Sequence, residues 1–212
     1  MLGFLEKFSR LEELMSQSVL KNVDSDQILL INSISWDIYE TVLKSCENTS
    51  HYRFKYLEGT LEIMSPSRRY EFDKKIIALL LETYFIETGI DFYPLGSTTF
   101  RREAAARGIE PDECYCFDSE KPVPDLAIEV VVTSGGIDDL VIYQGLGVPE
   151  VWFWQNHQFL LYYLRGDKYE QISKSEFLPD LDLNLFASLV ISGEKPKDLI
   201  LKFRQSIRRS SS

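Results

Sequence analysis

The sequence predicts an α/β fold of the mixed α+β kind with a central sheet, and three observations lead to this fold class. Residues 126–132 are apolar and rich in β-branched side chains apart from Glu129, which is typical of a strand covered on both faces. Residues 52–64 alternate in hydropathy around a Glu-Gly turn, as a hairpin does. A helix over residues 137–146 is long enough for a right-handed crossover to a parallel strand.

Local patterns predict the other elements in order. Ser35 suits the N-cap of a helix, and apolar residues at helical spacing indicate a long helix over residues 69–88. Trp152 and Trp154 share one face of their strand and are expected in the core. Further strands are expected over residues 91–102, 111–117, 150–154 and 159–164, with a short closing segment over 177–190.

The chain divides into three segments. Residues 1–30 contain a short amphipathic pattern and are expected to form a helical appendage. Residues 31–190 are expected to form the main domain, and residues 191–212 a C-terminal tail, of which we expect the last residues, 207–212, to fray.

Composition and charge limit the classes of function. The chain has 212 residues and a formal net charge of −10, which argues against nucleic-acid binding over the whole surface. A nuclease with a local basic groove stays compatible with this charge. The three cysteines make neither a disulfide framework nor a zinc motif, and no apolar run approaches the roughly 20 residues of a membrane helix. We therefore expect a cytoplasmic protein without a membrane partner.

Acidic residues accompany the predicted central strands. Glu129 lies inside the apolar run, where an unpaired carboxylate would cost several kcal/mol. Asp125 shares its face of the strand, and Asp112 lies near the start of the preceding strand. Neighbouring strands that each present a carboxylate can hold a hard divalent cation. Alternatively, Asp112 and Asp125 lie at loop edges and Glu129 pairs with a basic side chain.

The first turns of the long helix carry a basic cluster in this acidic chain, formed by Arg68, Arg69, Lys74 and Lys75. Such a cluster is either a solvated helix face or a set of phosphate contacts that position a nucleic-acid backbone without reading its sequence.

Four stretches carry a resemblance to a known family. They are Leu57-Glu58-Gly59 with Met64-Ser65-Pro66-Ser67, then Glu110-Pro111-Asp112-Glu113, residues 124–130 and residues 145–152. The order helix, strand, strand, strand, helix, strand resembles the PD-(D/E)XK nuclease superfamily and its restriction-endonuclease-like core. Residues 31–187 more specifically resemble the bacterial Uma-two-type restriction endonuclease family. The N-terminal helix and hairpin would be additions to this core.

The resemblance implies Mg²⁺-dependent hydrolysis of phosphodiester bonds, with Mn²⁺ as a substitute metal and DNA as the partner. Asp112 and Glu129 match the acids that hold the metal. Asp125 ranks third among the catalytic candidates, because it could hold a metal-bound water or orient a basic partner. Glu71 is a weaker match to an acid that some relatives supply from the helix. A homodimer is a candidate assembly, since nucleases of this type often pair to cut two strands.

The sequence departs from the family pattern at two points. The superfamily lysine would stand at Val131, and this family places it on the following helix, about where this chain has Asp139. No lysine occurs from residue 122 to residue 167. A histidine early in the long helix is replaced by Tyr70. Because Asp139 adds charge that opposes binding of a polyanion, the candidates for a replacement cation are Lys74, Lys75 and Arg68.

Three hypotheses remain open. A Mg²⁺-dependent DNA endonuclease is favoured by the acid pair Asp112 and Glu129. A catalytically degraded member, kept as a binding or dimerisation module, is favoured by the missing lysine. A structural protein with ion-paired acids is the third.

Overall fold

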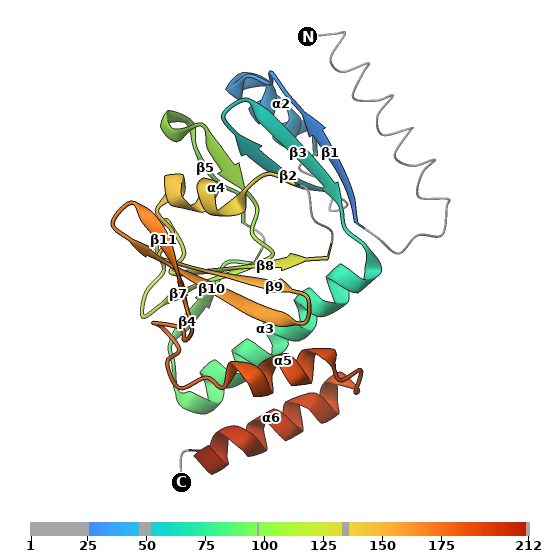
Figure 1. Cartoon of the computed structure of the whole chain (residues 1–212), viewed down its shortest axis with the longest axis vertical. Coiled ribbons are helices and arrows are strands. Elements are labelled where there is room, and N and C mark those ends of the chain that lie inside the picture. Colours follow the sequence, from blue (N-terminus) through green and yellow to red (C-terminus); the bar gives the residue numbers. More distant parts are fainter. Residues whose placement is uncertain (1–25, 47–51, 97, 133–135, 211–212) are drawn as a thin grey trace.

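The computed structural model describes residues 26–46, 52–96, 98–132 and 136–210. The amphipathic pattern near the N-terminus, within residues 1–25, lies outside this part of the chain. The described residues form two sheets and five α-helices, which confirms the predicted mixed α+β fold (Figure 1). None of the helices in the described ranges is both long enough and apolar enough to cross a membrane.

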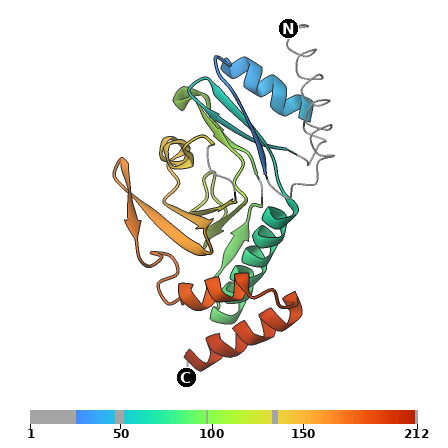
Figure 2. The same cartoon turned by 45° about the vertical axis from the view of Figure 1, so that its right-hand side comes forward.

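The first sheet is antiparallel, with the strand order β1-β3-β2-β6-β5. Its strands are β1 (Gln27–Ile31), β2 (Arg53–Leu57), β3 (Thr60–Ser65), β5 (Phe100–Arg102) and β6 (Arg107–Ile109). The predicted hairpin is β2 and β3, and Gly59 allows its turn with a φ of 91°. Helix α2 (Trp36–Cys46) covers the outer face (Figure 2). On this face Tyr39 stacks on Tyr56. The inner face is turned toward the second sheet.

The second sheet has the strand order β11-β10-β9-β8-β7-β4. Its strands are β4 (Phe92–Pro94), β7 (Glu113–Phe117), β8 (Leu126–Val131), β9 (Glu150–Gln155), β10 (Gln158–Arg165) and β11 (Lys168–Ile172). Strands β8 and β9 are parallel, with Ile128 opposite Trp152, and helix α4 (Asp139–Leu146) connects them. This confirms the predicted crossover between parallel strands.

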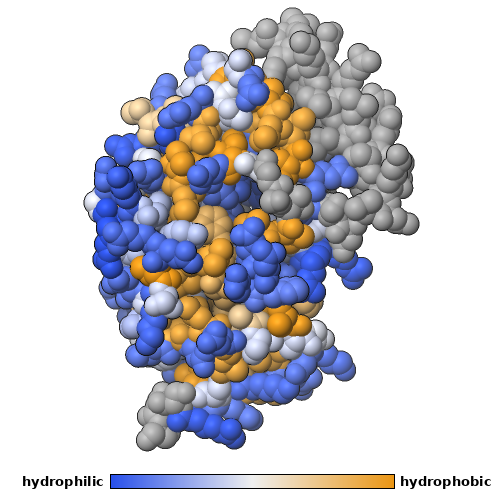
Figure 3. Space-filling model, in the orientation of Figure 1, coloured by the Kyte–Doolittle hydropathy of each residue, from blue (hydrophilic) through white to orange (hydrophobic). Residues whose placement is uncertain are grey.

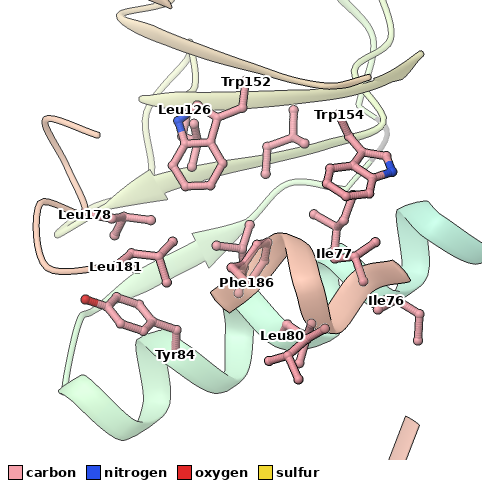
Figure 4. Packing of buried hydrophobic residues seen from close by; sticks show 14 of the residues in the cluster. Ile76, Ile77, Leu80, Tyr84, Leu126, Trp152, Trp154, Leu178, Leu181 and Phe186 are labelled. Atoms are coloured by element: carbon pink, nitrogen blue, oxygen red, sulfur yellow. The ribbon is translucent and has the colours of Figure 1, made fainter. Parts of the chain in front are cut away.

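The main core lies between the second sheet and three helices, α3 (Arg68–Thr88), α5 (Leu183–Ile191) and α6 (Pro196–Ser210). Trp152 and Trp154 point from β9 toward Ile77 of α3 and Phe186 of α5, as predicted for core residues (Figure 4). The Ser67 hydroxyl caps α3 by accepting a hydrogen bond from the Tyr70 N–H at 3.2 Å. This fixes the first turn of α3, which carries Tyr70.

Two local predictions are wrong. The C-terminal tail, whose end from residue 207 was expected to fray, forms helix α6 as far as Ser210. Its Leu199, Phe203 and Ile207 are buried at a four-residue spacing and help to pack the helix on α3. The strand predicted over residues 91–102 is two strands, β4 in the second sheet and β5 in the first. The chain therefore passes from one sheet to the other in this segment.

Candidate active site

A cavity of about 300 Å³ lies between the inner face of the first sheet and strands β8 to β10 of the second. In the space-filling view the surface is hollowed between the two sheets, and hydrophilic residues lie in the hollow (Figure 3). The polar side chains that line the cavity are Asp26, Lys55, Glu62, Tyr70, Glu129, Asp138, Asp139, Gln155 and Tyr162. Phe153 and Leu160 contribute part of the apolar wall.

The Lys55 ammonium is the point on which three carboxylates converge. Its Nζ lies 2.7 Å from Asp139 Oδ2, 3.8 Å from Glu129 Oε2 and 4.0 Å from Glu62 Oε1. The Lys55 side chain is 12% exposed. Burial lowers the pKa of Lys55, but attraction by Asp139, Glu129 and Glu62 outweighs it, so the pKa lies above its usual value. Lys55 therefore stays charged.

Three different elements bring these groups together. Lys55 and Glu62 are directly opposite in the β2–β3 register, so both side chains leave the same face of the hairpin. Glu129 projects from the middle of β8, and Asp139 is the first residue of α4, after the N-cap Asp138. The site thus depends on the first sheet folding over the second.

Asp112 and Glu129, the two predicted metal ligands, each accept a hydrogen bond from a buried phenol. The Tyr70 hydroxyl donates to Asp112 Oδ1, and the Tyr143 hydroxyl donates to Glu129 Oε1. The Val130 N–H donates to Asp112 Oδ2 at 2.7 Å. Because β7 and β8 are antiparallel neighbours, this bond holds Asp112, just before β7, against the strand that carries Glu129.

Burial dominates the protonation of all four acids of this group. It raises the pKa of Asp112 to about 7, although the Val130 N–H and Lys55 act in the opposite direction. Burial also raises the pKa of Glu129 well above its usual range, against the attraction of Lys55. The pKa values of Glu62 and Asp139 are raised by burial in the same way. One lysine is therefore too little positive charge for the acids around it.

Glu62 and Asp139, two acids of the cavity lining, differ in the hydrogen bonds of their remaining oxygens. Glu62 Oε2 accepts a hydrogen bond from the Ile137 N–H at 2.6 Å, and a Cβ at Gly136 would clash with the same oxygen. A side chain at position 136 would therefore displace Glu62. Asp139 Oδ1 is buried and has no hydrogen-bond partner in the described structure.

The other predicted site residues lie elsewhere. Asp125 Oδ2 accepts hydrogen bonds from the Phe117 N–H at 2.8 Å and from Lys121 Nζ at 2.6 Å, and Asp125 does not line the cavity. Glu71 lies 3.6 Å from the Arg53 guanidinium. The structure brings Asp112 close to Tyr70, Glu129 and Asp139, although Asp112 itself is not among the residues that line the cavity. Asp125 and Glu71 are not part of this group.

The three cations considered as replacements for the family lysine also lie outside the cavity lining. Lys75 pairs with Glu113 at 3.6 Å. Lys74 is buried on α3, and burial together with repulsion from Arg53 lowers its pKa. Arg68 is exposed at the first turn of α3.

Lys55 and Glu62 were not predicted from the sequence. They alternate with core residues in a hairpin, and such charges usually face solvent. The available signal was that Lys55 and Glu62 occupy matching positions across the turn. That pairing predicts a cross-strand ion pair, but it does not tell which structure covers it.

The Uma2 family model, described as "Putative restriction endonuclease", matches residues 39–192. Among solved structures, the chain is similar to "a putative nuclease belonging to DUF820" from Anabaena variabilis, with a TM-score of 0.41 and 14% identity over 71% of this chain and 90% of that one. No curated protein matches. Because the family model spans more than half of the chain, this protein belongs to the Uma2 family.

Proposed function

We propose that this protein is a Mg²⁺-dependent endonuclease that hydrolyses DNA phosphodiester bonds in the cavity between the two sheets. The observation that carries the proposal is an excess of buried acids over cations. Four carboxylates, from Glu62, Asp112, Glu129 and Asp139, interact electrostatically around one lysine, Lys55. Membership of the Uma2 family supports the reaction class.

The donor set fits a divalent cation. Its members are carboxylates, which Mg²⁺ prefers, and Asp139 Oδ1 is a buried oxygen without a hydrogen-bond partner. Among the described residues, no three His, Cys, Asp or Glu side chains are arranged as a ready metal cage. Mg²⁺ does not need such a cage, because it usually keeps several waters and takes only one or two carboxylates from the protein. We assign those two ligands to Asp112 and Glu129.

The residues around the proposed metal site would have separate tasks. Asp112 and Glu129 hold the cation, and the Tyr70 and Tyr143 hydroxyls orient the two carboxylates by hydrogen bonds. When bound, Mg²⁺ supplies a Lewis acid that activates water and offsets charge on the phosphate. Arg68 and Arg69 are exposed beside Tyr70 on the first turn of α3. We expect them to contact phosphates of the DNA backbone.

A second candidate is a catalytically degraded module that keeps the acids for stability. One observation favours it: both oxygens of Asp112 already accept hydrogen bonds, from Tyr70 and from Val130. Lys55 likewise offsets part of the charge of Glu129. In this case the acid cluster would stay folded without a cation and would not hydrolyse DNA.

Isothermal titration of Mg²⁺ and Mn²⁺ tests both candidates, with nicking of supercoiled plasmid measured on the same samples. We expect wild type to bind and nick. Glu129→Gln should bind at least about tenfold more weakly and lose nicking. The matched control is Glu150→Gln, which alters a buried acid on β9 outside the cavity lining and should retain both.

The outcomes separate the candidates. Metal binding without nicking in wild type would favour the degraded module. Failure of wild type to bind either cation would overturn the metal site and leave Glu129 as a partner in a structural ion cluster.

A further inference from the structure

Among the described residues that line the cavity, Lys55 is the only basic one. Its side chain enters the cavity from β2 of the first sheet, whereas Glu129 enters from β8 of the second sheet. A phosphate that approaches Glu129 meets the carboxyl groups of Glu129, Glu62 and Asp139, and each of them repels it when ionised. The Lys55 ammonium is the group in this lining that attracts a phosphate, and its contacts with Asp139 and Glu129 hold it in front of Glu129.

We propose that Lys55 is a catalytic residue of this site and that Asp139 is the residue that positions it. This inference rests on the proposed hydrolytic function. The Lys55 ammonium donates a hydrogen bond to a non-bridging oxygen of the scissile phosphate and stabilises the charge that accumulates there. It stays protonated, so it acts neither as a base nor as a nucleophile.

The hydrolysis balances without a further reactant. The oxygen of a water molecule forms a bond to phosphorus, and the ester bond from phosphorus to the departing sugar oxygen breaks. The attacking water releases a proton to solvent, and the departing oxygen takes up a proton from solvent. The products are a phosphate monoester and a hydroxyl group. The role of Lys55 is to hold the phosphate while its charge increases, which is when a preorganised donor contributes most.

Asp139 has the geometry of a positioning residue. Its Oδ2 lies 2.7 Å from Lys55 Nζ, the shortest of the three ion pairs of this lysine. The helix start that carries Asp139 is fixed by Asp138, whose Oδ1 accepts a hydrogen bond from the Leu140 N–H at 3.0 Å. Both members of the pair line the cavity. An exchange of the two side chains would therefore keep an ammonium in the cavity and deliver it from α4 instead of β2.

Four variants test the proposal by nicking rates at saturating Mn²⁺ and by Mn²⁺ titration. Lys55→Met should lower the nicking rate at saturating metal by at least about 10²-fold, while its Mn²⁺ affinity is kept or increased, because a cation has left the ligands. Asp139→Lys alone should also lose activity, since two ammonium groups would compete for one place. The double exchange, Lys55→Asp with Asp139→Lys, should recover most of the activity lost in Asp139→Lys. Lys202→Met, which removes an exposed ion-paired lysine on α6, is the control.

Each outcome decides a separate point. A nicking rate of Lys55→Met within threefold of wild type, roughly the scatter expected of a silent substitution, would overturn the catalytic role and leave the endonuclease assignment intact. Wild type that binds Mn²⁺ and never nicks would overturn the proposed function, and this inference with it. If Lys55→Met does not fold, the double exchange decides: recovered nicking supports the proposal, and a folded double variant without nicking overturns it.

Discussion

Buried acids near the two ends of the parallel strand pair β8 and β9 differ in the hydrogen-bond donors and positive charge around them. Where the strands begin, Asp125 accepts hydrogen bonds from a backbone N–H and a lysine. At the same end, Glu150 accepts one from the Trp152 indole at 2.6 Å and one from the Glu176 N–H at 2.9 Å. Both acids have donors that the fold supplies locally.

Further along β8 the buried acids have fewer hydrogen-bond donors. Glu129 has one phenol and a share in a lysine that also serves Asp139 and Glu62. The Asp139 oxygen that points away from Lys55 has no hydrogen-bond partner in the described structure. Burial alone therefore does not mark a functional acid, since Glu150 is fully buried as well. The distinction lies in whether the fold supplies enough donors and positive charge.

Asp112→Asn should produce the largest effect, and it should change nicking and stability in opposite directions. Nicking should fall by at least about 10²-fold, because one of the two proposed metal ligands is lost. The metal-free variant should be more stable than wild type at pH 8, by about 1–4 kcal/mol. The folded-state pKa of Asp112 is raised to about 7 from 3.8, so its favourable contribution is complete below pH 4 and is lost as the pH rises through 7.

Urea unfolding in EDTA at pH 5 and pH 8 measures this effect. The wild-type free energy of unfolding should fall between the two pH values by more than that of Asp112→Asn. A variant that is less stable than wild type at pH 8 would show that Asp112 is a structural acid like Glu150.

Glu150→Ala tests the opposite end of the strands. Removal of this carboxylate leaves the Trp152 and Glu176 N–H donors without an acceptor, which should cost about 2 kcal/mol of unfolding free energy. Mn²⁺ affinity and nicking per folded molecule should not change. Loss of metal binding in a folded Glu150→Ala protein would refute the division of the strands into a structural end and a functional end.

The sequence predicted most of the fold because its patterns are local. The hairpin, the long helix and the strand around Glu129 each have their own hydrophobic period. Asp112 and Glu129 were chosen as candidates because one precedes a predicted strand and the other lies within one. Helix α6 was missed because its apolar positions, such as Phe203, were treated as part of a tail. Its amphipathic spacing was available in the sequence.

The position of Lys55 was harder to predict, for a physical reason. Its burial depends on the packing of one sheet over another, between segments that are 74 residues apart in the case of Lys55 and Glu129. Asp139 was interpreted as an unfavourable charge because its partner lies in the other sheet. Local patterns predict which side chains share a face, but not which distant face lies opposite.

Tyr143→Phe removes the phenol that donates a hydrogen bond to Glu129, which already has few donors. The Tyr143 hydroxyl lowers the pKa of Glu129, although burial dominates. Without it, the protonated form of Glu129 competes better with the metal, so Mn²⁺ affinity at pH 7 should fall about tenfold. The matched control is Tyr169→Phe, which removes a hydroxyl that donates to the Val148 carbonyl outside the cavity lining. Equal Mn²⁺ affinities in the two variants would mean that Tyr143 does not orient a ligand.

Asp125→Asn should have the smallest effect, and it decides the role of the acid that ranked third in the sequence. One oxygen of Asp125 accepts both the Phe117 N–H and Lys121, and an amide oxygen can keep the first of these bonds. The lost charge concerns a lysine at the surface, where ion pairs contribute little. We therefore expect a thermal midpoint close to that of wild type and unchanged nicking at saturating Mg²⁺. A large loss of nicking in the folded variant would extend the functional end of β8 to its first residues, because the Asp125 carboxylate would then act on the reaction without lining the cavity.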